Sequence, residues 1–460
     1  MKKEDTISAV ATALGESSIG IIRISGDEAI SVADRVFKSR NGKRLYEIGS
    51  YRAIYGNIES SEGELIDEAI ALVMRAPNSY TREDVVELQC HGGARSLMRT
   101  LSRTYEEGAR PAERGEFTKR AFLNGRIDLS QAQAVMDVIQ AKTDSALSMA
   151  SGNLSGKCSN EIKAVRQRIL GIIAHLEAVI DFPEDDLDSV AIESMRKNVV
   201  DIINELNNFL KTARAGKILR EGWTTAIIGK PNVGKSSLLN MLLRTDRAIV
   251  TEMPGTTRDS IEEYADVGGV PLHIIDTAGI RNTEDIIEKI GVEKSRAYAE
   301  QAGLVLAIFD GSQPLSDEDE EIISILKGKE VIILINKSDL EQKLEKNVFK
   351  EEFKDVPIIS ISTKTQNGLE SLQKIISEKA YGTVSNLEEM PLVRDERESN
   401  ILRRTIVHLQ EALQTIDNGM GEDFISIDLR SAWEVLGEFT GEAVGEDIID
   451  EIFSRFCIGK

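Results

Sequence analysis

Hydrophobic and polar positions alternate in short runs over the first part of the chain. Branched apolar runs at 19–24, 53–58, 69–74 and 85–88 are bounded by Gly, Pro, Asn or Ser, which is typical of β-strands. Helical patterns separate these runs. Residues 1–120 therefore predict a mixed α/β or α+β domain.

From Leu129 onward the apolar residues recur every three or four positions, the spacing that puts side chains on one face of an α-helix. The acidic, proline-containing segment 181–186 interrupts this spacing and predicts a turn between two long helices. We expect a helical domain formed by residues 121–220 and by residues 383–460, where the spacing returns. The apolar positions are Ile162, Val165, Ile169, Ile172, Ile173, Leu176, Val179 and Ile180, then Ile192, Met195, Val199, Ile202, Leu206 and Phe209, then Ile401, Leu402, Leu409, Leu413, Ile448, Ile449, Ile452, Phe453 and Phe456.

Residues 221–382 have a different texture, with near-continuous apolar runs separated by helical stretches. Strands of this kind are buried on both faces, so they predict a parallel sheet covered by helices. We therefore expect an α/β domain inserted into the helical domain. The predicted strands are 225–228, 272–275, 304–309, 331–335 and 358–362.

The composition is that of a globular protein, with 41% hydrophobic and 29% charged residues, and 460 residues predict two to four domains. The formal charge of −21 argues against broad affinity for nucleic acid and leaves only a local basic patch for such a role. The acidic run 316–321 is predicted to be a solvated helix start.

No apolar run approaches the roughly 18 residues of a membrane span, and the first residues lack the apolar core of a signal peptide. We therefore expect a cytoplasmic protein without a membrane partner. Cys90, Cys158 and Cys457 lie too far apart for a Cys-x-x-Cys zinc pair, and three cysteines do not make an even disulfide set.

The stretch from Gly229 to Ser236 matches the phosphate-binding pattern G-x-x-x-x-G-K-[ST] between a predicted strand and a predicted helix. Backbone N–H groups and the helix N-terminus surround the phosphates in such a loop. Lys235 is expected to reach the β- and γ-phosphates and to act in catalysis, and Ser236 to bind Mg²⁺. The predicted contacts of this loop are Asn232, Val233, Gly234, Lys235, Ser236 and Ser237.

Two further motifs predict a guanine nucleotide. A D-x-x-G element begins at Asp276, and an N-K-x-D element ends at Asp339, whose carboxylate can accept two hydrogen bonds from the guanine edge. Adenine presents no such donor pair, so GTP is the predicted substrate. The predicted contacts of these two motifs are Asp276, Thr277, Ala278 and Gly279, then Asn336, Lys337 and Asp339. A third loop, formed by Ser362, Thr363 and Lys364, stands where an S-A-K loop normally contacts the base, and Thr363 replaces its usual alanine.

The segment 255–259 is the candidate switch I, with Thr257 as the second protein ligand of Mg²⁺. Ile280 follows the D-x-x-G element and has no side chain that can orient water, so another group is required. The candidates are Glu284, Asp285 and Glu288, each of which is more often a solvated surface residue when taken singly.

A G domain with GKPNVGKS, GTTRD and DTAG between helical segments, and a chain ending in Phe456-Cys457-Ile458-Gly459-Lys460, resembles the MnmE (TrmE) family of tRNA modification GTPases. The resemblance covers the whole chain, and the terminal C-x-G-K is its specific part. It implies a Ras-like G domain that hydrolyses GTP while an FAD-dependent MnmG-type partner helps to form an aminomethyl or carboxymethylaminomethyl group on the wobble uridine of certain tRNAs.

The resemblance also implies a homodimer, a heterotetramer with the MnmG-type partner, and an N-terminal domain that dimerises and binds a formyl-tetrahydrofolate. The folate contacts carried over by position are Arg23, Glu87, Arg126 and Lys460, of which Arg126 is commonly a lysine in the family. Taken alone, Arg23 and Arg126 have the appearance of surface charges.

The family uses K⁺ beside the phosphates, which implies K⁺ ligands at Asn232, Thr251, Met253 and Thr256; Thr251 and Thr256 also join the GTP contacts. Its water-orienting glutamate corresponds to Glu288. Asn282, where members often carry Glu, departs from the pattern outside the catalytic position.

A lone cysteine near a C-terminus is usually inert, but the family motif implies a catalytic role for Cys457 as a covalent catalyst or a general acid. The alternative function is that of a GTPase checkpoint factor in ribosome assembly. That class usually carries a basic RNA-binding appendage, whereas the appendages here are acidic helices and a C-x-G-K tail.

Overall fold

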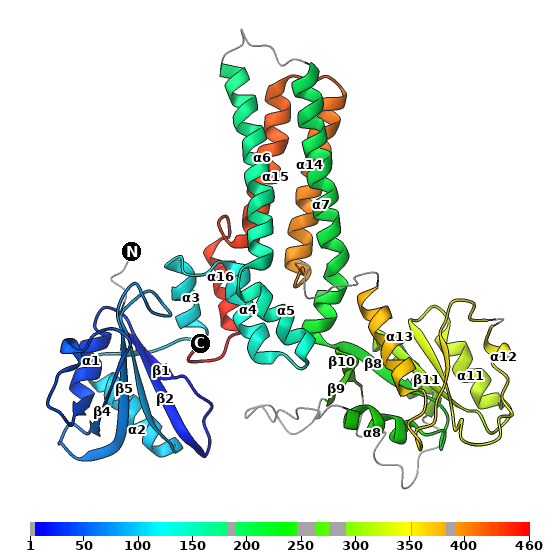
Figure 1. The fold of residues 1–460 in the computed structure, drawn as a ribbon, viewed down its shortest axis with the longest axis horizontal. Helices are drawn as coiled ribbons and strands as arrows, with labels where there is room; N and C mark the ends of the chain where they lie inside the picture. Colours follow the sequence, from blue (N-terminus) through cyan, green and yellow to red (C-terminus); the bar gives the residue numbers. More distant parts are fainter. Residues whose placement is uncertain (1–4, 182–188, 246–262, 276–290, 351, 383–391) are drawn as a thin grey trace. The chain divides into compact units, whose positions relative to one another are not determined.

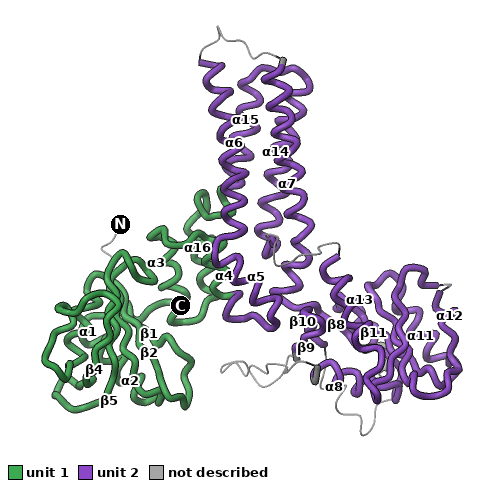
Figure 2. Tube along the Cα trace, viewed as in Figure 1, with its two compact units in different colours: residues 1–136, 437–460 green, residues 137–436 purple. Residues whose placement is uncertain are grey.

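The computed structural model describes residues 5–181, 189–245, 263–275, 291–350, 352–382 and 392–460. The chain divides into two compact units: unit 1 is residues 1–136 with 437–460, and unit 2 is residues 137–436 (Figure 2). Within the described ranges, no helix combines the length and the apolar character that a membrane span requires.

Unit 1 contains a seven-stranded sheet in the order β3-β4-β5-β6-β2-β1-β7 (Figure 1). Its pairs are antiparallel except for β1 with β7. The four predicted strands lie entirely within β2, β4, β5 and β6, whereas β1, β3 and β7 are too short to show a period in the sequence. The strands are β1 (Ile7–Val10), β2 (Ser17–Ser25), β3 (Phe37–Ser39), β4 (Arg52–Glu59), β5 (Leu65–Met74), β6 (Val85–Gly92) and β7 (Arg110–Pro111).

One face of this sheet is covered by helices α1 (Ala29–Val36) and α2 (Ala94–Glu106). Alternate strand residues, such as Ile22, Ile24, Leu88 and Cys90, form the core with these two helices because successive side chains of a strand point to opposite faces. The other face of the sheet carries Arg23 and Glu87, which stand opposite each other on β2 and β6.

The remaining helices of unit 1 form a second, smaller core. Helix α4 (Leu129–Gln140) supplies Leu129, Ala132 and Met136, and α16 (Glu446–Ser454) supplies Ile449 and Phe453. The ring centroids of Phe122, at the end of α3 (Glu116–Leu123), and Phe453 lie 6.3 Å apart. This core joins the last residues of the chain to the N-terminal part of unit 1.

Unit 2 contains long helices that confirm the expected helical periodicity. The segment 182–188, which contains most of the predicted turn, lies outside the described residues. Helices α14 and α7 pack on each other, as expected for the C-terminal and N-terminal helical segments. The Arg166 guanidinium lies 3.9 Å from the centroid of the Trp433 ring and joins α6 to α15. The helices are α5 (Asp144–Leu154), α6 (Lys157–Asp181), α7 (Ser189–Glu221), α14 (Glu396–Asp417) and α15 (Glu422–Thr440).

Between α7 and α14 along the chain, unit 2 forms a six-stranded sheet in the order β13-β12-β11-β8-β10-β9 (Figure 1). Neighbouring residues of its central strands, for example Ile227 and Ile228, belong to hydrophobic cores on opposite faces, so the sheet is buried on both sides as predicted. The elements are β8 (Trp223–Ile228), α8 (Lys235–Thr245), β9 (Glu263–Val267), β10 (Val270–Ile274), α10 (Gly291–Gln301), β11 (Leu304–Asp310), α11 (Asp317–Leu326), β12 (Val331–Asn336), α12 (Asn347–Lys350), β13 (Ile358–Ser360) and α13 (Leu369–Tyr381).

One edge of this sheet differs from the prediction of a parallel sheet. Strand β9 was not predicted, and it pairs with β10 in an antiparallel hairpin. The buried apolar residues of β9 are Ala265 and Val267, which alternate with polar or less buried residues. Strand β9 therefore does not show the continuous apolar run that marks a central strand. Gly268 and Gly269 have φ of +63° and +81° and form the tight turn.

The chain enters the sheet from α7 and returns to α14 through neighbouring segments. The Val393 amide donates to Thr212 Oγ1 at 3.1 Å, and a Cβ at Gly216 would lie 2.0 Å from the Val393 carbonyl oxygen. The absence of a side chain at Gly216, in the interior of α7, therefore allows the backbone at Val393 to pack directly against this helix. Beside this crossing, Arg394 is 4% exposed and pairs with Asp395 and Glu398, which stabilises its buried charge.

Candidate functional site

The phosphate loop of unit 2 lies between β8 and α8, as its motif requires. Asn232 and Gly234 have φ of +62° and +110°, which bend the backbone between strand and helix. A Cβ at Gly234 would lie 2.3 Å from Asn336 Nδ2, so only glycine fits at this position. Helix α8 begins directly after the loop and directs its N-terminal N–H groups toward it.

The Lys235 side chain folds back onto the phosphate loop and contacts its backbone. Its Nζ donates to the carbonyl oxygens of Gly229 at 2.7 Å and Lys230 at 2.9 Å. Burial lowers the pKa of Lys235 from its usual range. The ammonium is therefore held at the start of α8, and helix N-termini attract phosphate groups.

Asn336 connects the three motif loops of the nucleotide site. Its Nδ2 donates to Val233 O of the phosphate loop at 2.7 Å and to Thr363 Oγ1 at 3.3 Å, and its Oδ1 accepts from Thr363 N at 3.1 Å. It is 1% exposed. The first residue of N-K-x-D is therefore a structural hub of this site.

Asp339 is positioned by the third loop. Ser362 Oγ donates to Asp339 Oδ1 at 2.7 Å, and this hydrogen bond holds the pKa of the Asp339 carboxyl below its usual range. The carboxylate is thus kept ionised and able to accept hydrogen bonds. Lys337 has φ of +62°, and its Nζ donates to Asp310 Oδ2 at 2.6 Å, which fixes the loop on β11.

A contact missed by the sequence analysis connects the phosphate loop with α11. Lys230 Nζ donates to Asp319 Oδ2 at 2.6 Å and to Ser316 Oγ at 3.1 Å. Asp319 is 3% exposed, so the prediction of a solvated acidic run was wrong at this residue. The capping pattern of Ser316 and Asp319 was visible in the sequence, but its partner Lys230 was not.

Several predicted residues lie outside the described ranges. They are the switch I and K⁺ residues Thr251, Met253, Thr256 and Thr257, the D-x-x-G residues Asp276, Thr277, Ala278 and Gly279, and Ile280, Asn282, Glu284, Asp285 and Glu288.

In unit 1, the last residues of the chain dock onto the sheet. Gly459 has φ of +90°, and a Cβ there would lie 2.2 Å from Val10 O of β1. Ile458 forms an isolated β-bridge with Arg114, and Gly115 N donates to Cys457 O at 3.4 Å. The C-x-G-K tail thus reaches the sheet through its glycine.

Arg23 is the centre of this arrangement. Its Nε donates to Glu87 Oε1 at 3.0 Å, and its Nη1 donates to Gly459 O at 3.2 Å. The guanidinium also lies 5.5 Å from the centroid of the Tyr80 ring, and that of Arg126 lies 4.6 Å from the same ring. We call Arg23, Tyr80, Glu87, Arg126 and Lys460 the tail site.

The tail site gathers all four residues predicted to bind folate, together with Tyr80, which the sequence analysis missed. Nothing in the sequence near Tyr80 marks it, because its role arises from the two arginines that lie over its ring. Lys460 is half-buried, and burial together with the nearby charge of Arg23 lowers its pKa. Cys457 is exposed, and all three cysteines are free thiols.

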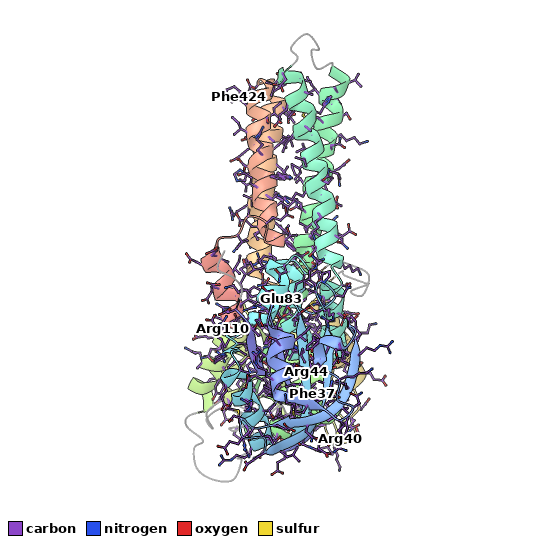
Figure 3. All side chains as sticks on the ribbon, turned by 90° about the vertical axis from the view of Figure 1, so that its left-hand side faces the viewer. Phe37, Arg40, Arg44, Glu83, Arg110 and Phe424 are labelled. Atoms are coloured by element: carbon purple, nitrogen blue, oxygen red, sulfur yellow. The ribbon has the colours of Figure 1, made fainter. Side chains whose placement is uncertain are left out.

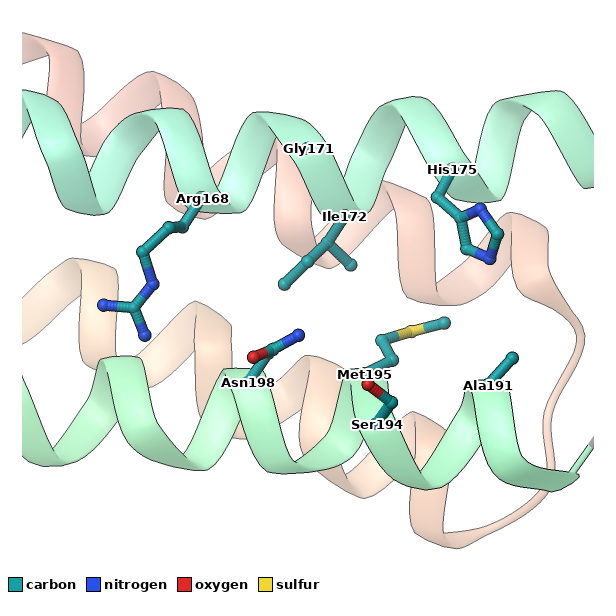
Figure 4. Close-up of a pocket in the computed structure, with 8 residues that line it drawn as sticks. All are labelled: Arg168, Gly171, Ile172, His175, Ala191, Ser194, Met195 and Asn198. Atoms are coloured by element: carbon teal, nitrogen blue, oxygen red, sulfur yellow. The ribbon is translucent and has the colours of Figure 1, made fainter.

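A pocket of about 400 Å³ between α6 and α7 is separate from both sites (Figure 4). Arg168, His175, Ser194 and Asn198 are among its lining residues, and none of the predicted catalytic, nucleotide, metal or folate residues lines it. The Arg168 guanidinium forms an ion pair with Glu205, with an N–O distance of 2.6 Å. We therefore assign the pocket no part in the predicted chemistry.

Comparison with known proteins covers both sites. A family model described as "GTP-binding protein TrmE N-terminus" matches residues 6–126, and one described as "MnmE helical domain" matches residues 129–457. A tRNA modification GTPase MnmE from Alkaliphilus metalliredigens is 47% identical over 99% of both chains, and one from Geobacillus thermodenitrificans is 47% identical over 100% of both. The chain belongs to the MnmE (TrmE) family of tRNA modification GTPases.

Membership of the MnmE family extends over both units. The relative from Clostridioides difficile, also a tRNA modification GTPase MnmE, is 47% identical over 99% of each chain. The match to the MnmE helical model ends at Cys457, within the terminal motif, and it includes the residues of the six-stranded sheet. The resemblance inferred from the sequence motifs is therefore confirmed.

Proposed function

We propose that this protein hydrolyses GTP and, with an FAD-dependent MnmG-type partner, forms a carboxymethylaminomethyl or aminomethyl group at C5 of the wobble uridine of certain tRNAs. The observation that carries the proposal is the convergence of three guanine-nucleotide loops on Asn336 in a chain of the MnmE family. Guanine-nucleotide loops occur in many GTPases, so the loops alone would not assign the tRNA reaction; the family membership is needed for that assignment.

The proposed GTP chemistry begins with recognition of the base. Asp339 accepts hydrogen bonds from the guanine edge, and the hydrogen bond from Ser362 keeps it ionised for that purpose. Lys235 and the amides of the phosphate loop bind the phosphates, and Ser236 binds Mg²⁺ together with Thr257. This division of roles is supported by the positions of the phosphate loop, the N-K-x-D loop and the Ser362 loop, which follow the carboxyl ends of β8, β12 and β13 in the parallel part of the sheet.

We further propose that K⁺ stabilises the charge that develops on the phosphates. Asn232 is exposed on the phosphate loop, so its amide oxygen is accessible to a cation, and an amide oxygen suits a hard cation. Thr251, Met253 and Thr256 complete the proposed site, and Glu288 orients the attacking water because Ile280 cannot.

The tail site is proposed to bind a formyl-tetrahydrofolate, which supplies the one-carbon unit. Glu87 presents a carboxylate to ring N–H donors, Tyr80 presents an aromatic ring, and Arg23, Arg126 and Lys460 present positive charge to the acidic end of a folate. These groups fit the chemistry of the ligand. Cys457 is proposed to act in the modification reaction because it is exposed within the same docked tail.

The proposed assembly is a homodimer that joins the MnmG-type partner in a heterotetramer and acts on tRNA. Membership of the MnmE family supports this assembly.

The proposed function is tested by two measurements on one variant, Cys457→Ser. Phosphate release by the purified protein should be faster in K⁺ than in Na⁺ and unchanged by the substitution, because a thiol in unit 1 takes no part in phosphoryl transfer. Nucleoside analysis of tRNA from cells that carry the variant should show loss of the modification, because serine is a weaker nucleophile and acid at neutral pH.

Two results would contradict the proposal. Equal GTPase rates in K⁺ and Na⁺ would remove the cation from the mechanism. Normal wobble-uridine modification in cells that lack the whole protein would show that the protein is not needed for the tRNA reaction.

A further inference from the structure

Residues 35–55 of unit 1 have a composition unlike the rest of the chain. Six Lys or Arg residues and one Glu lie in this segment, whereas the whole chain has a formal charge of −21. Tyr46, Tyr51 and Tyr55 lie in the same segment, out of eight tyrosines in the chain. We call these residues the basic segment; its cations are Arg35, Lys38, Arg40, Lys43, Arg44 and Arg52.

The three tyrosines of the basic segment are exposed. Tyr46, Tyr51 and Tyr55 are 58%, 62% and 44% accessible. Tyr51 has φ of +56°, a left-handed conformation that bulky residues rarely adopt, and its amide donates to Val73 O at 2.7 Å. Such conformations concentrate at functional sites because surrounding structure must hold them. The unusual backbone thus presents an aromatic ring to solvent.

Two arginines of the basic segment stack on these rings. Arg40 Cζ lies 4.8 Å from the centroid of the Tyr55 ring, and Arg44 Cζ lies 5.4 Å from that of Tyr46. Arg40 N also donates to Tyr55 O at 3.2 Å, which places Arg40, the residue after β3, opposite Tyr55 of β4. Arg40 and Arg44 lie on the side of unit 1 that faces the viewer in Figure 3. Planar cations over aromatic rings make surfaces on which nucleobases stack.

The charge of the basic segment is accessible. Arg40 pairs with Glu68 and Arg44 with Asp34, but both arginine side chains remain 55% exposed. Lys43 and Arg52 are exposed, and their side chains form no ion pair or hydrogen bond with any residue in the described ranges. These two cations therefore have no carboxylate partner to displace when they meet a phosphate.

We propose that the basic segment binds the phosphate backbone and unpaired bases of the RNA substrate. Lys and Arg neutralise phosphates, and tyrosine rings stack on bases that loops leave unpaired. The acidic remainder of the chain repels RNA, so a concentrated basic surface is where such contact is favourable. The exposed rings favour RNA over an acidic protein surface. That this RNA is a tRNA rests on the proposed function.

The test measures binding of an unmodified tRNA transcript to the full-length protein by fluorescence anisotropy, between about 50 and 200 mM salt. The double variant Lys43→Gln/Arg52→Gln should bind about tenfold more weakly, and the slope of log affinity against log salt should fall by about 1.4 to 1.8. The matched control is Arg95→Gln/Arg99→Gln, two exposed arginines on α2, which should leave both quantities unchanged.

A second variant tests stacking without changing charge. Tyr51→Ser should weaken binding by about fivefold or more while the salt slope stays the same, and Tyr51→Phe should restore the affinity. GTP hydrolysis should be normal in every variant, because none of these residues belongs to the nucleotide site.

Equal tRNA affinity in wild type and Lys43→Gln/Arg52→Gln, or equal losses in that variant and its control, would overturn the proposal. Loss of self-association in light scattering with unchanged tRNA affinity would also overturn it, by showing that the segment binds protein. In either case K⁺-stimulated GTP hydrolysis and uridine modification by the wild type would leave the proposed function intact. Conversely, the variants could bind tRNA more weakly, as expected, while the wild-type protein supports no uridine modification. That result would refute the proposed function but would support the RNA-binding role of the basic segment.

Discussion

The nucleotide site of unit 2 and the tail site of unit 1 are assembled in different ways. The nucleotide site joins short contiguous motifs at the ends of β8, β12 and β13. The tail site joins single residues from distant segments; Arg23 and Gly459, which share a hydrogen bond, are 436 positions apart. The first site can therefore be recognised from local sequence patterns, whereas the second exists only after the chain has folded.

Glycine has a comparable structural role in both sites. Gly234 and Gly459 each have a positive φ, and a Cβ at either would meet a neighbouring polar atom within 2.3 Å. In unit 2 that atom belongs to Asn336, in the same nucleotide site. In unit 1 it belongs to Val10 of β1, so the glycine serves the docking of the tail. Substitutions at the two glycines should consequently separate the two functions.

Gly234→Ala should have the largest effect. The left-handed backbone and the clash with Asn336 Nδ2 together cost about 3 kcal/mol, which corresponds to a loss of GTP affinity of about a hundredfold. Titration with a fluorescent GTP analogue measures this. Gly421→Ala is the control, because a Cβ there meets no atom within 4 Å. Wild-type affinity in Gly234→Ala would show that the loop and Asn336 move apart readily.

Asp339→Asn should have the next largest effect on the nucleotide site. The amide reverses one hydrogen bond to guanine, so GTP affinity should fall by roughly tenfold to a hundredfold and xanthosine triphosphate should become the better ligand. Competition between the two nucleotides measures the change. Folate binding at the tail site should stay normal, and an unchanged preference for GTP would refute the role of Asp339.

Gly459→Ala should weaken the tail site alone. The strained φ and the approach to Val10 O should lower affinity for formyl-tetrahydrofolate by about tenfold, as measured by calorimetry, while GTP hydrolysis continues. Gly15→Ala, a glycine of unit 1 with no atom within 4 Å of its Cβ, is the control. A parallel loss of GTP affinity would mean that the two sites are not independent.

Thr363→Ala should have the smallest effect. The substitution removes the 3.3 Å contact with Asn336 Nδ2 but keeps the backbone hydrogen bond from Thr363 N to Asn336 Oδ1. GTP affinity should change by less than about threefold. Asn336→Ala, which removes both contacts, should be far more damaging. Equal losses of GTP affinity in Thr363→Ala and Asn336→Ala would show that the Thr363 hydroxyl, and not its backbone N–H, makes the important contact with Asn336.

Most of the regular elements could be predicted because their patterns are long. The continuous strand of β11 and the three-four spacing of α6 each extend over enough residues to show a period. Strands β1, β3 and β7 are two to four residues long, and β9 lies at a sheet edge, so none of them shows a distinctive pattern. Their formation depends on the neighbouring strands with which they pair.

The sequence by itself determined the kind of nucleotide and the family, because G-x-x-x-x-G-K-S, N-K-x-D and the terminal C-x-G-K are local strings whose spacing carries their chemistry. Only the tertiary structure decided that Arg23 and Arg126 both lie over the Tyr80 ring, that Lys230 reaches Asp319, and that Arg40 stacks on Tyr55. The physical reason is that a hydrogen bond or a ring contact depends on separation in space. Packing of distant segments sets that separation, and no local pattern records it.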